Sequence, residues 1–173
     1  MKYFLLMLPL VFMSIAGFGQ KNACPFPRQS IIRPDSQETQ QLVKMLDSLT
    51  LQTYDQATKI PMFIKEVLNC WSWKNNWSIA DKGQPFNATD VIDTSLPNRQ
   101  LLYLGVNENY LLIAYNHGGG FASNCPVLLF RFENKQVISV MYWSTFNEKM
   151  RGKRDVIKTL RRLRPNPYSE FHI

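Results

Sequence analysis

The chain has 173 residues, of which 45% are hydrophobic, 13% aromatic and 19% charged, and its formal net charge is +7. This length and composition are those of one ordinary globular domain that is large enough to bury a core. They exclude a low-complexity chain, and no internal repeat is present.

The N-terminus has the pattern of a cleavable signal peptide. A short basic start is followed by an uncharged apolar run at 4–15, and Gly17 and Gly19 supply the small residues of a cleavage site. The run is too short for a membrane span, which needs about 20 apolar residues. We expect residues 1–19 to be removed before Gln20, which makes the protein secreted or periplasmic with no transmembrane segment after cleavage.

Three cysteines are present, and export to an oxidising compartment favours one disulfide and one thiol. We predict a Cys70–Cys125 bond because both residues flank predicted regular elements. Cys24 lies in a proline-rich segment and is the alternative partner for either. The cysteine spacing fits no zinc motif and the chain has only two histidines, so we expect no metal and no cofactor.

After an extended lead-in at 20–34, we expect a single α+β domain over 35–173. Asp35 and Glu38 form a capping-box pattern at the start of a first helix. A second helix is predicted from Pro61, with apolar residues at helical spacing as far as Trp71.

The chain between the second helix and its C-terminal part has a different pattern. Residues 81–98 are polar and predict a long loop, preceded by a possible short strand at 77–80. Four apolar segments with short connections follow, and they predict an antiparallel meander. These segments are 100–106, 110–116, 127–133 and 136–144.

The last predicted helix is basic. Residues 154–163 have apolar side chains on one side, and Thr145 to Glu148 is a capping-box candidate upstream. Between 148 and 164, eight basic residues stand against two acidic ones. The predicted fold is therefore α+β, with the N-terminal helices packed on one face of a four-stranded antiparallel meander and a basic C-terminal helix.

A glycine-rich segment joins the two central strands. The sequence His117-Gly118-Gly119-Gly120 resembles the HGGG oxyanion motif of some lipases and esterases, in which backbone N–H groups stabilise a tetrahedral oxyanion. That resemblance implies a nucleophilic serine within G-x-S-x-G, and this pentapeptide is absent. A hairpin loop in which the glycines adopt positive φ is the alternative explanation.

Other candidate chemistry has structural explanations as well. His117 with Cys125 or Ser123 makes a possible nucleophilic pair, which competes with the use of the cysteine in a disulfide. Asp90 and Asp93 resemble solvated loop acids more than the two spaced acids of a glycosidase. Of the clustered tryptophans, Trp71 belongs to its helix's apolar stripe, whereas Trp73 and Trp77 are candidates for ligand stacking.

The assembled expectation is a binding module for a protein, a peptide or a cell-envelope component, with no enzymatic activity. The alternative is a small hydrolase that uses the glycine loop. Nucleic acid is an unexpected partner because the protein is exported, but the basic helix could contact an anionic surface. The candidate binding residues are His117, Gly118, Gly119, Gly120, Phe121, Trp73, Trp77, Arg154, Lys158, Arg161 and Arg162.

Overall fold

A five-stranded antiparallel sheet forms the centre of the computed structural model, which describes residues 24–72, 76–89, 93–118, 124–146 and 149–163. The strands lie in the order in which they occur in the chain, each beside the next. They are β1 (Gln52–Tyr54), β2 (Arg99–Val106), β3 (Tyr110–His117), β4 (Asn124–Glu133) and β5 (Gln136–Phe146). The helices are α1 (Ser36–Ser48), α2 (Met62–Trp71) and α3 (Lys153–Arg162), with 3-10 turns at Arg28–Ser30 and Ala57–Lys59.

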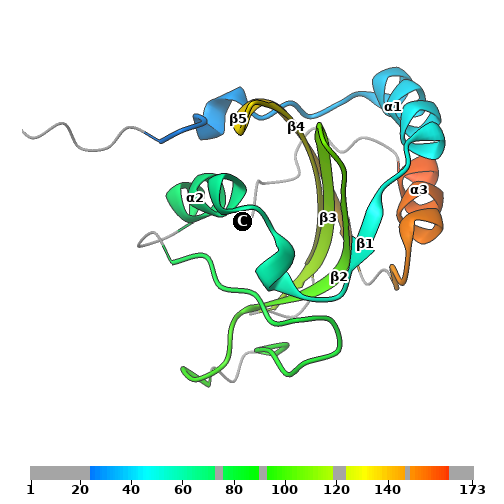
Figure 1. The fold of residues 1–173 in the computed structure, drawn as a ribbon. Helices are drawn as coiled ribbons and strands as arrows, with labels where there is room; N and C mark the ends of the chain where they lie inside the picture. Colours follow the sequence, from blue (N-terminus) through cyan, green and yellow to red (C-terminus); the bar gives the residue numbers. More distant parts are fainter. Residues whose placement is uncertain (1–23, 73–75, 90–92, 119–123, 147–148, 164–173) are drawn as a thin grey trace, which may run out of the picture.

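Helices cover both faces of this sheet, so the molecule has three layers (Figure 1). On one face α2 packs through Ile64, Leu68 and Trp71 against alternate strand residues such as Phe130. On the other face α1 and α3 lie side by side over the remaining set of strand residues. Burial of apolar side chains on both faces explains why the central strands have few polar positions.

Several predicted elements are confirmed. Asp35 accepts a hydrogen bond from the Glu38 N–H at 2.8 Å and Glu38 accepts one from the Asp35 N–H at 2.9 Å, which completes the capping box of α1. The four predicted strands are present within one to three residues of their expected bounds. The turn between β4 and β5 has positive φ at Asn134 and Lys135, as a tight two-residue hairpin requires.

Four parts of the predicted fold were wrong. The sheet has a fifth strand, β1, which is too short to show an alternating pattern. The N-terminal helices do not share a face, because α1 and α2 lie on opposite sides of the sheet. Thr145 belongs to β5, and α3 begins after Gly152. The short strand expected at 77–80 is reduced to a single parallel bridge between Ala80 and Gln100.

The predicted disulfide pairing was also wrong. The bond joins Cys24 to Cys70, whereas Cys125 keeps its thiol on β4 and is fully buried. Cys125 faces the α1–α3 layer, and Cys70 is on α2 on the other side of the sheet, so these two sulfurs cannot meet.

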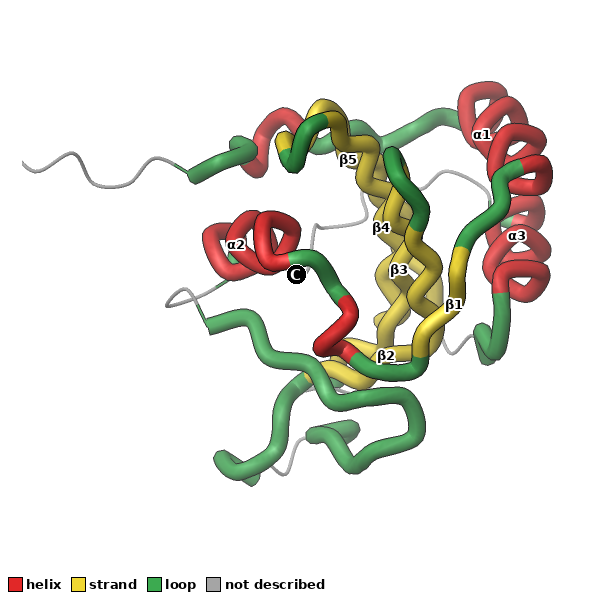
Figure 2. Tube along the Cα trace, in the orientation of Figure 1, coloured by secondary structure: helices red, strands yellow, loops and turns green. Residues whose placement is uncertain are grey.

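The lead-in packs onto the sheet in its described part, from residue 24 to residue 34. The Phe26 side chain is buried against Trp71, and its carbonyl oxygen accepts a hydrogen bond from the Trp71 indole at 2.8 Å. Further along, Ile32 makes two backbone hydrogen bonds with β5. Figure 2 shows this segment reaching from the α2 side of the molecule to α1. Residues 1–19, predicted as a signal peptide, lie outside the described residues.

Candidate functional site

Polar and aromatic side chains gather at one end of the sheet, on its α2 face. This sheet-end cluster consists of Trp77 from the loop before β2, Arg99 from β2, Tyr115 and His117 from β3, and Asn124 from β4. Arg99 pairs with His117 across β2 and β3, and His117 pairs with Asn124 across β3 and β4. Paired residues of neighbouring strands point to the same face, so the three side chains form a row.

Arg99 is the unusual member of the cluster because it is a cation with only 7% of its surface exposed. No carboxylate in the described part of the chain forms an ion pair with it. Its guanidinium carbon lies 5.7 Å from the centre of the Trp77 ring, and its Nε has no hydrogen-bond partner. Burial lowers the pKa of Arg99, and the neighbouring Tyr115 opposes this shift.

Tyr115 and Trp77 bring two further polar atoms close to Arg99. The two rings meet edge to face at 5.9 Å, and both side chains are buried. The Tyr115 hydroxyl interacts with the Arg99 guanidinium and with the Trp77 indole N–H, but neither the hydroxyl nor the indole N–H makes a well-formed hydrogen bond. Burial raises the pKa of Tyr115 well above its ordinary value despite the nearby Arg99 cation, so the phenol is neutral and keeps its proton.

His117 and Cys125, the candidate nucleophilic pair, lie on opposite faces of the sheet. The thiol of Cys125 faces the α1–α3 layer and donates to the Asn116 Oδ1 at 3.0 Å. His117 is the next residue after Asn116, so its side chain points to the α2 face. The described residues therefore do not bring this imidazole and this thiol together, and Ser123 lies outside them.

Gly118 is held against the long loop. Its N–H donates to the Asn98 carbonyl at 2.9 Å, so this amide is already used and cannot stabilise an oxyanion. A Cβ at Gly118 would overlap the carbonyl group of Asn87, which shows that close backbone contact, with no positive φ, requires glycine here. Gly119, Gly120 and Phe121 lie outside the described residues.

Asn87 organises the long loop and leaves it little chemistry of its own. Its Nδ2 lies 2.9 Å from the carbonyl oxygens of Asp93 and Leu96, and its Oδ1 accepts from the Asp93 N–H at 2.9 Å. The Asp93 carboxylate accepts from the hydroxyl and N–H of Ser95, and these bonds lower its pKa. Asp93 thus serves the loop's conformation, and Asp90 lies outside the described residues.

Two of the three clustered tryptophans, Trp71 and Trp77, belong to the described residues, and both are buried. Trp71 stacks on Phe130 within the core, as its place in the helical stripe predicts. Trp77 is 8% exposed, so no open stacking face is available on it. Trp73 lies outside the described residues.

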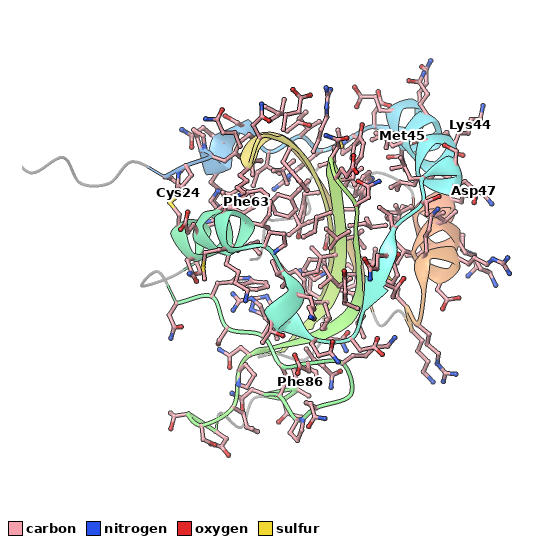
Figure 3. All side chains as sticks on the ribbon, viewed as in Figure 1. Cys24, Lys44, Met45, Asp47, Phe63 and Phe86 are labelled. Carbon is pink, nitrogen blue, oxygen red and sulfur yellow. A yellow bond between two sulfur atoms is a disulfide. The ribbon has the colours of Figure 1, made fainter. Side chains whose placement is uncertain are left out.

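The basic face of α3 lies on the outer side of the α1–α3 layer. Its members are the four exposed residues of the helix: Arg154, Lys158, Arg161 and Arg162. Arg161 approaches Asp47 of α1 at 3.3 Å, and both side chains are about half exposed or more. Figure 3 labels Asp47 and Lys44 on the neighbouring α1, with their side chains directed away from the sheet.

An open pocket of about 400 Å³ is lined by residues of the lead-in: Arg28, Gln29, Ile31 and Arg33. Both arginines are exposed to solvent, in contrast to Arg99. The guanidinium of Arg33 lies 5.9 Å from the centre of the Tyr142 ring on β5.

Arg99 is not among the binding residues that the sequence predicts. Its position could have indicated its burial. Arg99 lies two residues before the buried Leu101, so both side chains point to the same face of β2. This spacing indicates a buried cation only once it is known which face of β2 packs against the core. From the sequence alone, an arginine at the end of a strand is expected to be exposed to solvent.

Among the described residues, no group of three or more histidine, cysteine or acidic side chains is arranged to hold a metal ion. Within that same part of the chain, no helix has the length and apolarity to cross a membrane. Comparisons with protein-family models, with curated proteins and with solved structures give no match.

Proposed function

We propose that this protein is an exported, non-enzymatic binding module that attaches to an anionic component of the cell envelope through the basic face of α3. The observation that carries the proposal is that every exposed position of α3 is basic. The buried positions of the same helix are Val156, Ile157, Thr159 and Leu160. A helix divided in this way has its charge on the side that is available to a partner.

The neighbouring acids compensate little of this charge. Among the described residues, the Asp47 carboxylate forms its ion pair with Arg161, and a surface ion pair of this kind contributes little stability. Asp155 accepts a hydrogen bond from the Arg151 N–H at 2.9 Å, at the start of α3. Arg154, Lys158 and Arg162 form no ion pair with a described carboxylate, so their charges are available to an anionic surface.

Secretion or export to a periplasm is part of the proposal. The Cys24–Cys70 disulfide supports it, because such bonds persist in oxidising compartments outside the cytosol. The signal-peptide pattern at residues 1–19 would direct the chain to export. In that setting anionic lipids and polymers are abundant partners, and nucleic acid is not.

Vesicle binding tests the attachment. Purified protein is sedimented with phosphatidylcholine vesicles that contain, or lack, about 30% phosphatidylglycerol, at about 0.1 M salt. We expect binding only to the anionic vesicles, and release as the salt concentration rises. Each basic residue near such a surface contributes about 1 kcal/mol, so Arg154→Gln, Lys158→Gln and Arg162→Gln together should weaken binding about 100-fold.

The matched control removes the same charge elsewhere. Lys59→Gln, Lys65→Gln and Lys135→Gln lie outside α3 and give a protein of equal net charge. This control should keep most of its affinity for the anionic vesicles. Equal losses in the two triple variants would mean that net charge alone drives attachment, and equal binding to neutral vesicles would exclude an electrostatic contact.

A further inference from the structure

We propose that the sheet-end cluster is a binding site for a carboxylate group of a small ligand or peptide, with Arg99 as its anchor. The site lies on the α2 face, away from the basic face of α3, so this inference is independent of attachment through that helix. Its starting point is an arginine that is nine-tenths buried and has no ion-pair partner among the described residues.

A buried charge without a counter-charge is costly, and folded proteins normally pair it or use it. The Trp77 ring beside Arg99 gives some compensation through a cation–π contact. That contact leaves the Arg99 Nε without a hydrogen-bond acceptor. An anionic ligand would supply the missing counter-charge and the missing acceptor together.

The groups around Arg99 are hydrogen-bond donors. The neutral Tyr115 hydroxyl and the Trp77 indole N–H lie near each other and near Arg99, and neither makes a well-formed hydrogen bond. Asn124 accepts from the Ser144 hydroxyl at 2.8 Å through its carbonyl oxygen, so the group that it still offers is its amide N–H₂. A site with one guanidinium and several neutral donors favours a ligand group that accepts hydrogen bonds. No described carboxylate of the protein itself occupies this site.

The balance of charge favours a carboxylate over a phosphate. Arg99 is the one permanent cation of the sheet-end cluster, so a group with one negative charge is neutralised by it. The planar guanidinium also matches the two oxygens of a carboxylate. His117 and Ser144, on the same face near the end of the sheet, are partly exposed, so a ligand would approach Arg99 from their side.

Titration of the Trp77 indole N–H by NMR tests the inference with defined probes. Nitrogen-labelled protein is titrated with acetate and benzoate, with the neutral acetamide and benzamide, and with inorganic phosphate. The Trp77 signal is assigned with Trp77→Phe. We expect saturable shifts of this signal with the two carboxylates, no saturable shift with the two amides, and weaker binding of phosphate.

Two variants of Arg99 separate a binding role from a structural one. Arg99→Met removes a buried, unpaired charge, so it should abolish carboxylate binding while the melting temperature stays equal or rises. Arg99→Lys keeps the charge but loses the planar fork, and we expect it to weaken binding about 10-fold. Arg131→Gln, at an exposed arginine paired with Glu133, should bind like the unchanged protein.

The outcomes are decisive in either direction. Saturable carboxylate binding that both Arg99 variants lose or weaken would support the site. Equal shifts with benzamide, tighter binding of phosphate, or unchanged benzoate binding in either Arg99 variant would overturn it. A large fall in melting temperature in both variants, with no carboxylate binding in the unchanged protein, would show that Arg99 is structural.

Discussion

Gly118 is the residue at which the glycine-rich segment contacts the long loop. Its glycine identity is required by contact with the Asn87 backbone, and its N–H is bonded to Asn98. The sequence HGGG is compatible with an oxyanion hole, with positive φ, and with close packing. These possibilities differ only in what lies next to the glycine in space.

This close contact predicts a measurable cost. Gly118→Ala would force a Cβ against a backbone carbonyl, which cannot move as a flexible side chain can, so we expect a loss of about 2 kcal/mol in the free energy of unfolding. Urea denaturation measures it. Gly152→Ser also adds a Cβ, but in open space at the N-cap of α3, and should be neutral or slightly stabilising. Similar values for both variants would contradict the packing explanation.

Arg99 and Cys125 show the same limit at the residue scale. Arg99 becomes a candidate site only because Trp77 and Tyr115 enclose it, and neither neighbour is close in sequence. Cys125 loses its candidate role as a disulfide partner or as the nucleophile for His117 because it occupies the other face of the sheet. Residue type suggested the chemistry, and position in space decided it.

At the scale of elements, a helix or strand could be predicted where the sequence around it has a single clear pattern. The capping box of α1 and the apolar stripe of α2 depend on contacts within a few residues, so they could be predicted. The capping-box pattern at Thr145 was overridden because the strand β5 continues through it, paired with β4. β1 has no pattern of its own and exists because β2 offers it an edge.

The α1–α3 pair depends on a contact that neither helix specifies alone. The Lys153 ammonium contacts the carbonyl oxygens of Asp47 and Leu49 at the C-terminal end of α1, where the helix dipole favours a positive charge. Lys153→Met should therefore lower the free energy of unfolding by about 1–2 kcal/mol in urea denaturation. The exposed Lys158→Met should change it by about 0.5 kcal/mol or less. A cost at Lys158 as large as that at Lys153 would count against this assignment.

At the scale of the whole molecule, the disulfide ties the lead-in to the layer formed by α2. It closes a loop across a sequence separation of 46 residues and holds Phe26 against Trp71. Crosslinks of this kind mainly restrict the unfolded chain. The two cysteines lie far apart in sequence, and their pairing depends on the path of the lead-in over the sheet.

Reduction of this bond gives the corresponding prediction. Cys24→Ser with Cys70→Ser should lower the free energy of unfolding by about 2–4 kcal/mol. In a Cys125→Ala control, a reductant should lower the free energy of unfolding as much as it does in the unchanged protein. A thiol count provides a second check: unfolded, non-reduced protein should show one reactive thiol, and folded protein should react slowly because Cys125 is buried. Three reactive thiols would exclude the disulfide.

The amino-acid sequence alone predicts the α+β class, the boundaries of most elements and the concentration of positive charge near the C-terminal helix. These features follow from local spacing of apolar, capping and charged residues. Other features are visible only in the folded molecule: helices cover both faces of the sheet, Cys24 pairs with Cys70, and Arg99 is buried beside Trp77 and Tyr115. Such features join residues that are distant in the chain, and their energies depend on burial and on neighbours that no local pattern contains.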